Sequence, residues 1–361
     1  MKGWYDMGVK VKFFVAYQGR IECHDYVDFY QLKPSFITRL RWKYIESCYD
    51  VITAQYLKGK VFVPSIRNTF NQLREFLPDA VVIRNYSLGN LKIIFLCRLL
   101  GIKKIVMYVQ EPLYGKYMYR MGWKEVIKKI LFPNAVFTPV LYNGVYRSKE
   151  QMTGLADSFI PLISENTRLQ NRVYCPEGII RLLDIGKYRP YKNHFFIVDA
   201  LSRVKQPELF KLTIIGQLSN DIEKRYFSEL EEYIRRKKLQ NIISLRGEID
   251  YKAMQSIYKQ HDILILASKE LASISVVEAM ANGLCVIGSI FNGTSCYIDE
   301  FDCGKTFDCT NIESLVNTLN FYINNIDAIQ NSGMKAMAVV KEHLSFNVYR
   351  DGLFALINDK C

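Results

Sequence analysis

The sequence alternates short apolar runs with longer segments of helical periodicity, and this pattern occurs in two successive blocks. The apolar runs are rich in Val and Ile, which is typical of strands buried on both faces of a parallel sheet. Such a sheet requires helices on both faces, so the sequence predicts an α/β architecture. The predicted strands cover residues 9–16, 60–63, 80–83, 105–109 and 135–138 in the first block, and residues 179–185, 211–215, 242–245, 263–267 and 285–287 in the second.

The length of 361 residues exceeds what one hydrophobic core usually covers. Together with the two blocks it predicts two Rossmann-like domains, an N-terminal one over residues 1–165 and a C-terminal one over residues 166–340. We expect residues 341–361 to form a helix that returns toward the N-terminal domain. The polar residues 161–176 have proline at both ends and are the expected linker.

Positive charge is concentrated in the first half of the chain. Residues 1–165 hold 24 Lys and Arg against 13 Asp and Glu, whereas residues 166–361 hold 24 against 23. This imbalance predicts different partners for the two domains. The nine cysteines form no C-x-x-C pair, which favours a reducing cytosol and argues against a zinc site. No apolar run is long enough to span a bilayer, so we expect a soluble or peripheral protein.

Ligands of open parallel sheets bind at the carboxyl ends of the strands, so the loops after the strands hold the candidate residues. The first loop of the second block places Lys187, Arg189 and Lys192 next to Gly186 and ahead of a helix. This arrangement suits a phosphate or diphosphate, although basic loops are often merely solvated. Gly216 ends the next strand, where a lone glycine usually indicates a turn.

Residues 263–288 are the most informative stretch. A buried strand runs into a loop that holds Glu270, Ser273 can cap the following helix, and Glu278 lies within that helix. The helix N-terminus could bind an anion, and the two carboxylates could accept hydrogen bonds from sugar hydroxyls. Either glutamate could also be an ordinary acid at a helix start.

These residues together resemble the donor domain of family 4 glycosyltransferases, which have the GT-B fold of two Rossmann-like domains facing each other across a cleft. The resemblance is collinear over residues 178–350, and residues 78–82 (P-D-A-V-V) extend it weakly into the first half. The motifs that carry it are Gly186-x5-Lys192, Ile215-Gly216, Leu245-Arg246-Gly247, Asp262–Leu266 and Ser268-x-Glu270-x7-Glu278-Ala-Met-Ala-x-Gly283.

The resemblance implies that a sugar moves from a nucleotide diphosphate sugar, UDP- or GDP-linked, to an acceptor hydroxyl with retention of configuration. It implies that Lys192 and Lys187 bind the diphosphate, that Glu278 holds the ribose, and that Glu270 lies near the donor sugar. Catalytic roles thus fall on Glu270, Lys192 and Lys187. The remaining donor-side candidates are Gly186, Arg189, Gly216, Arg246, Ser273, Ile274 and Ser275.

Family members often place a histidine at the end of a strand in the first domain, where this chain has Gln110 and Glu111 as weaker acceptor-side candidates. The chain's own His194 and His261 are expected to be packing or helix-surface residues. No D-x-D sequence is present, and the basic loop could replace a metal. We therefore expect a metal-independent hexosyltransferase without a cofactor.

A basic segment begins at Lys116 and ends at Phe132, with Lys116, Arg120, Lys124 and Lys128 on one predicted helical face beside an aromatic one. This pattern predicts a helix on an anionic membrane, with a surface helix packed on its own domain as the alternative. The acceptor would then be a lipid-linked saccharide or glycolipid for cell-surface polysaccharide or lipopolysaccharide. The protein would be cytoplasmic, on the inner face of the plasma membrane.

Three other functions are alternatives. A GT-B nucleotide-sugar hydrolase or epimerase would share the donor residues, as would a catalytically inactive sugar-nucleotide binder. A nucleic-acid-binding protein fits the positive charge, but the sequence has no helix-turn-helix, zinc knuckle or RNP-like aromatic motif. We therefore expect no nucleic-acid partner.

Overall fold

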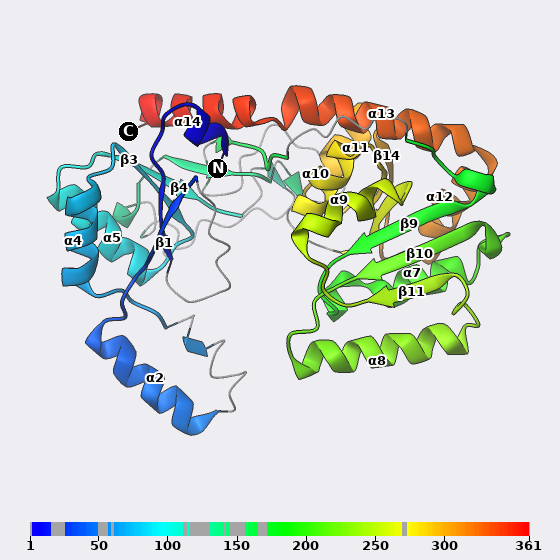
Figure 1. Ribbon diagram of the computed structural model, residues 1–361, viewed down its shortest axis with the longest axis horizontal. Coiled ribbons are helices and arrows are strands. Elements are labelled where there is room, and N and C mark those ends of the chain that lie inside the picture. The colour runs from blue at the N-terminus through cyan, green and yellow to red at the C-terminus, as the bar shows by residue number, and fades with distance from the viewer. Residues whose placement is uncertain are drawn as a thin grey trace. The chain divides into compact units, whose positions relative to one another are not determined.

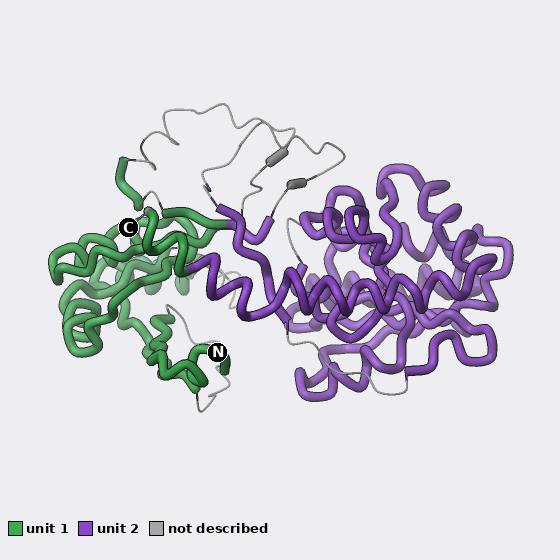
Figure 2. Tube along the Cα trace, turned by 90° about the horizontal axis from the view of Figure 1, so that it is seen from above, with its two compact units in different colours: residues 1–109, 121–137, 354–361 green, residues 110–120, 138–353 purple. Residues whose placement is uncertain are grey.

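The computed structural model describes residues 2–15, 26–49, 57–58, 61–110, 114–115, 127, 130–133, 135–140, 142–143, 156, 158–164, 172–268 and 273–360. Contacts divide the chain into two compact units, coloured separately in Figure 2. Unit 1 comprises Met1–Val109, Met121–Phe137 and Phe354–Cys361, and unit 2 comprises Gln110–Arg120 and Thr138–Leu353. The boundary predicted at residue 165 lies outside the described residues and stays a prediction. None of the described helices is long and apolar enough to cross a bilayer.

The main sheet of unit 1 contains β3, β4 and β6, which pair in parallel in that order. Of the elements given next, the sequence predicts the strands β1, β3, β4 and β6, but not β2, β5, β7, β8, α1 or α2. The elements that precede residue 160 are α1 (Lys2–Asp6), β1 (Lys12–Val15), β2 (Asp28–Gln31), α2 (Phe36–Cys48), α4 (Ile66–Phe76), β3 (Ala80–Arg84), α5 (Leu88–Leu99), β4 (Lys104–Tyr108), β5 (Tyr114–Gly115), β6 (Val136–Thr138), β7 (Tyr142–Asn143) and β8 (Ser158–Phe159).

The strand predicted over residues 60–63 is wrong, because the described residues 61–63 form a turn and irregular chain. The backbone of Val63 is bonded elsewhere. Its N–H donates to Oγ1 of Thr38 at 3.0 Å, and its carbonyl accepts from the same hydroxyl at 3.0 Å and from the Ser35 N–H at 2.9 Å. These bonds attach Val63 to the start of α2 and leave it no sheet ladder.

Unit 2 is built on a parallel sheet with the strand order β11-β10-β9-β12-β13-β14 (Figure 1). Numbered along the chain this order is 3-2-1-4-5-6, the order of a doubly wound Rossmann-type sheet. The sequence predicts all of these strands except β14, whose first three residues are half-buried. The elements that follow residue 175 are η1 (Pro176–Gly178), β9 (Ile180–Ile185), η2 (Pro190–Lys192), α7 (His194–Leu201), η3 (Pro207–Leu209), β10 (Phe210–Ile215), α8 (Asp221–Arg236), β11 (Ile243–Arg246), α9 (Tyr251–Lys259), β12 (Ile263–Leu266), α10 (Ile274–Ala281), β13 (Cys285–Ser289), α11 (Ser295–Phe301), β14 (Gly304–Phe307), α12 (Ile312–Asn324), α13 (Ile326–His343) and α14 (Phe346–Lys360).

Helices cover both faces of this sheet, and alternate strand residues face opposite cores. Leu182, Ile263 and Ile265 pack in one core with α7, α8 and α12. Leu183 and Leu264 pack in the other core with α9, α10, α11 and α13. This alternation follows from the two-residue period of a strand, and it explains why the strands read as continuous apolar runs.

The two halves of the sheet meet between β9 and β12 through a short ladder. Only Leu182 and Leu183 of β9 are in register with β12, opposite Ile263 and Leu264. The last residues of β9 pair only with β10, and the last residues of β12 pair only with β13. The central strands therefore part toward their carboxyl ends, the position at which doubly wound sheets bind ligands.

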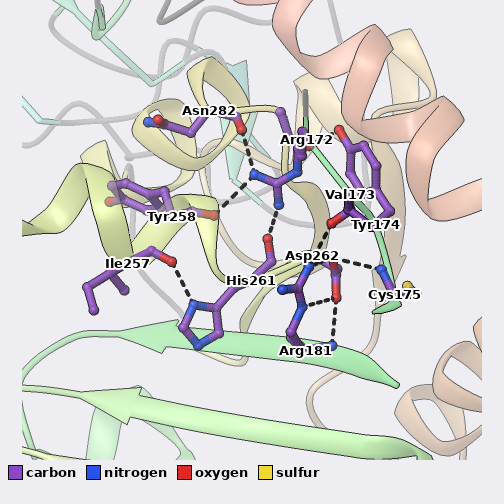
Figure 3. Close-up of polar contacts among 11 residues, drawn as sticks. Arg172, Val173, Tyr174, Cys175, Arg181, Ile257, Tyr258, His261, Asp262 and Asn282 are labelled. Carbon is purple, nitrogen blue, oxygen red and sulfur yellow. Dashed lines mark hydrogen bonds and ion pairs between the residues drawn. The ribbon is translucent and has the colours of Figure 1, made fainter. Parts of the chain in front are cut away.

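The amino end of the same junction is held by Asp262, whose side chain is buried (Figure 3). Its carboxylate accepts hydrogen bonds from Nε and Nη2 of Arg181 at 2.9 and 2.7 Å, and from the Arg181 N–H at 2.9 Å. It also accepts from the N–H of Cys175 at 3.1 Å. Since Arg181 belongs to β9 and Asp262 precedes β12, this ion pair joins the two halves of the sheet.

Arg172, within the expected linker, is fixed to unit 2 as well (Figure 3). Its guanidinium donates to the carbonyl oxygens of Tyr258 and Asn282 at 3.2 and 3.1 Å, and to that of His261. The hydroxyl of Tyr174 donates to the carbonyl oxygen of Gly283 at 2.7 Å. The part of the linker that lies at residues 172–175 is therefore an anchored part of unit 2.

The C-terminal residues Phe354–Cys361 group with unit 1 rather than unit 2. Within unit 1, the rings of Phe354 and Trp4 are 5.6 Å apart and meet edge to face. This grouping is compatible with the return of residues 341–361 that the sequence predicts, which stays a prediction.

Replacing Asp262 by Asn should lower the free energy of unfolding of unit 2 by about 3 kcal/mol, because it leaves Arg181 without its carboxylate partner. Glu313→Gln is the control, since the exposed Arg203–Glu313 pair should contribute less than about 1 kcal/mol. Urea denaturation of the full chain measures both. Equal stability of the Asp262→Asn variant and the parent would contradict the role of this ion pair.

Candidate functional site

The loop after β9 brings Lys192 and Gly186 into contact. Lys192 ends the short helix η2 and is buried, with 6% of its surface exposed. A Cβ atom added to Gly186 would lie 2.6 Å from Cε and 2.9 Å from Nζ of Lys192. The lysine side chain therefore passes directly over Gly186, and any larger residue there would displace it.

Gly216, at the end of β10, allows the two neighbouring loops to meet. A Cβ atom on Gly216 would lie 2.2 Å from the carbonyl oxygen of Gly186 and 2.8 Å from the ring of Tyr188. The hydroxyl of the buried Tyr188 lies 3.0 Å from the carbonyl oxygen of Ile214 and 2.8 Å from that of Arg246. Gly216 thus has a packing role that holds the Gly186 loop in place.

A buried polar cluster lies beside Lys192. His194 and Asp184 are buried, with 3.6 Å between Nε2 of His194 and Oδ2 of Asp184. Nδ1 of His194 lies 3.3 Å from the hydroxyl of Tyr226. Burial, and to a lesser extent the charge of Lys192, lowers the pKa of His194 to about 3. His194 is therefore a neutral packing residue at physiological pH, in agreement with the sequence analysis.

The other two cations of this loop have different surroundings. Lys187 is exposed, directly after Gly186. Nε of Arg189 lies 3.2 Å from Oε1 of the buried Glu223, and its Nη2 donates to Asn220 at 3.4 Å. The structure thus pairs Arg189 with the start of α8, whereas Lys187 is exposed and Lys192 is buried over Gly186.

On the other side of the junction, α10 begins at Ile274 after Ser273. The sequence predicts that Ser273 caps this helix, but this is wrong. The Ser273 hydroxyl makes no capping hydrogen bond and lies 2.7 Å from the hydroxyl of Ser275. Both serines are buried, whereas Ile274 is exposed. The N-terminal amides of α10 are therefore not capped by the Ser273 side chain, and such amides are suited to bind an anion.

Glu278, in the second turn of α10, is half-buried and held by two tyrosines of α9. The hydroxyl of Tyr258 donates to Oε2 at 2.9 Å, and that of Tyr251 donates to Oε1 at 3.4 Å. Burial raises the pKa of Glu278, and the two tyrosine hydroxyls oppose this rise. The tyrosines therefore favour the ionised carboxylate, the form that accepts hydrogen bonds from ligand hydroxyls.

The described structure does not bring the remaining candidate residues to this site. Glu270, Glu111 and the four cations of the segment from Lys116 to Phe132 lie outside the described residues. Gln110 is half-buried after β4. Arg246 lines a separate hollow that also includes Pro176, Glu177, Ile179, Arg181, Lys211, Thr213, Gln260 and His261. Within the described ranges, no group of three His, Cys, Asp or Glu side chains could hold a metal ion.

The sequence did not indicate the residues that position the candidate donor-binding side chains. Tyr251 and Tyr258 are seven residues apart, which places them on one face of a helix, but nothing in the sequence pairs that face with Glu278. Asp184 gave a usable signal, because an acid inside an apolar strand requires a polar partner. Tyr188 gave no such signal, because a tyrosine in a loop of basic residues is expected to be exposed.

Residues 170–336 match the family model described as glycosyl transferases group 1. This range includes Lys192, Gly216 and Glu278. A search of curated proteins finds no match.

Solved structures resemble the whole chain. A glycosyltransferase from Rickettsia africae covers 99% of this chain and 92% of its own, with 16% identity and a TM-score of 0.68. The match to Anabaena HepE, crystallised with UDP and glucose, covers 92% of this chain and 86% of the HepE chain, with 13% identity and a TM-score of 0.61. The match to WaaG, a glycosyltransferase involved in lipopolysaccharide biosynthesis, covers 98% of this chain and 93% of the WaaG chain, with 13% identity and a TM-score of 0.61. The chain therefore has the GT-B fold of glycosyltransferases, and its residues 170–336 match the family model of glycosyl transferases group 1.

Proposed function

We propose that this protein transfers a hexose from a nucleotide diphosphate sugar to an acceptor hydroxyl, with retention of configuration. The observation that carries the proposal is the position of Lys192 over Gly186, where the central strands of unit 2 part. The family match over residues 170–336 supports it. The UDP and glucose in the Anabaena structure favour a UDP-linked donor.

In this proposal the donor diphosphate binds between the Gly186 loop and the start of α10. The ammonium of Lys192 meets the phosphate oxygens, with exposed Lys187 as a second cation and the first amides of α10 as further donors. Glu278 accepts hydrogen bonds from the ribose hydroxyls. Before the donor binds, Tyr258 already holds Glu278, and Gly186 leaves room for the Lys192 side chain above it.

The chemical step breaks the bond between the anomeric carbon and the diphosphate oxygen and forms a bond from that carbon to the acceptor oxygen, whose proton passes to the leaving diphosphate. Negative charge grows on the leaving diphosphate, so cations and helix amides directed at it stabilise the transition state more than the ground state. A buried ammonium is effective here, because little water screens its charge. Glu270 is proposed to lie near the donor sugar, on the resemblance alone.

The proposed acceptor is a lipid-linked saccharide or glycolipid for cell-surface polysaccharide or lipopolysaccharide. The role of WaaG in lipopolysaccharide biosynthesis and the positive charge of residues 1–165 support this part. The proposed location is the cytoplasmic face of the plasma membrane, with the segment from Lys116 to Phe132 as one contact.

Lys192→Ala should lower kcat/KM for the donor about a hundredfold, because it removes a cation from the leaving diphosphate. Glu278→Gln should raise KM about tenfold through the loss of charged hydrogen bonds to the ribose. The controls are Lys205→Ala and Glu313→Gln, which change exposed side chains elsewhere in unit 2. Initial rates with UDP-sugars measure the effects. Parent-like kinetics in both site variants would refute the donor site.

Tyr258→Phe tests how Glu278 is held. Because the tyrosine hydroxyl lowers the pKa of Glu278, its removal should raise that pKa further. Donor binding requires the carboxylate, so donor affinity falls as the pH falls through this pKa. The acid limb of the profile of affinity against pH should therefore move to higher pH in this variant. Tyr233→Phe, which loses a hydrogen bond to Asp199, is the matched control and should leave the limb in place. Titration of UDP-sugar affinity against pH reads out both, and coincident profiles would exclude the effect.

We further propose that the reaction needs no metal, because Lys187 and Lys192 can neutralise the diphosphate. Transfer rates should be the same with EDTA and with added Mn²⁺. Activity lost in EDTA and restored by Mn²⁺ would show that a metal supplies the charge instead.

A further inference from the structure

The helix α2 of unit 1 presents a row of large apolar side chains to solvent. Phe36, Ile37, Leu40 and Tyr44 are 66%, 61%, 52% and 68% exposed. At 100° per residue these four positions fall within an arc of about 100°. We call them the α2 apolar face. Contiguous exposed apolar surface of this kind marks an interaction site.

Cations border this face on both sides. Around the helix axis, Arg39 and Lys43 lie next to one edge of the arc and Arg41 lies next to the other. All three side chains are exposed. The helix has one carboxylate, that of Glu46, which forms an ion pair with Lys58. The exposed part of α2 is therefore apolar in the middle and positive at both edges.

The opposite side of α2 is fixed to unit 1, so the apolar face has no route into the core. Thr38 and Ile45 are buried, and Thr38 bonds the backbone of Val63. Nε1 of Trp42 donates to the carbonyl oxygen of Lys58 at 3.0 Å. The helix also has a capped start, because the hydroxyl of Ser35 accepts from the N–H of Thr38 at 3.2 Å. The face is thus held outward.

We propose that the α2 apolar face docks unit 1 on an anionic lipid bilayer. The apolar side chains would enter the boundary between headgroups and acyl chains, and Arg39, Arg41 and Lys43 would meet lipid phosphates. The excess of cations in residues 1–165 gives the same charge complementarity over a wider surface. A second copy of this chain fits less well, because a two-fold contact through α2 would bring like charges together. The inference deepens the proposed lipid-linked acceptor, yet it can be tested without any transfer.

The test uses the full chain and two kinds of vesicle, phosphatidylcholine alone and phosphatidylcholine with phosphatidylglycerol. The parent should co-sediment with the anionic vesicles. The triple variants Phe36→Gln/Leu40→Gln/Tyr44→Gln and Arg39→Gln/Arg41→Gln/Lys43→Gln should each lower the partition coefficient about tenfold or more. Ile222→Gln/Met334→Gln is the matched control, since it changes exposed apolar residues of unit 2 and should leave partitioning unchanged.

A Tyr44→Trp probe gives a second readout that does not depend on loss of binding. Its fluorescence should be quenched by brominated lipid if the face enters the bilayer. The variant Lys116→Gln/Arg120→Gln/Lys124→Gln/Lys128→Gln, run in parallel, measures the separate contribution of that segment.

Parent-like sedimentation of the apolar triple variant, or a Tyr44→Trp probe that brominated lipid leaves unquenched, would overturn the proposal. So would a parent that forms dimers which the triple variant loses, because the face would then join two copies. Binding of UDP in unit 2 is measured on the same samples by thermal shift. If vesicle binding fails while UDP still binds, only this inference falls, and if UDP fails to bind, the proposed donor site falls.

Discussion

The buried ion pair between Asp262 and Arg181 is the interaction on which the rest of unit 2 depends. It joins the two halves of the sheet at the amino ends of β9 and β12, which share only two pairs of residues. A junction that is held at one end can open at the other without separating the halves. The strands β9 and β12 therefore join the two halves of the sheet at one end and leave a place for a ligand at the other.

The site residues are held by groups that do not themselves reach a ligand. Gly186 makes room for Lys192, Gly216 lets the Gly186 loop approach β10, and Tyr258 orients Glu278. The neutral His194 lies beside Lys192 and adds no second positive charge to the buried loop. Preorganisation of this kind limits the reorganisation that is needed when a charged donor binds.

The sequence predicted the strands of unit 2 well, because strands buried on both faces read as continuous runs such as residues 263–267. It could not predict β14, since a half-buried strand with Lys305 and Thr306 lacks that pattern. It misread residues 60–63, whose hydrogen bonds go to α2 rather than to a sheet. Motif spacing located Lys192 and Glu278, but the pairing of Arg189 with Glu223 and the tyrosines around Glu278 depend on tertiary contacts. The role of Glu270 rests on the motif alone.

The contact between Trp4 and Phe354 has a consequence for the order of folding. Unit 1 is assembled from residues at both ends of the chain, whereas residues 138–353 of unit 2 form one continuous stretch. During synthesis, residues 138–353 of unit 2 leave the ribosome before residues 354–361 of unit 1 do. While unit 2 is synthesised and begins to fold, unit 1 therefore lacks residues 354–361, and a chaperone that binds the nascent chain meets unit 1 in this incomplete form.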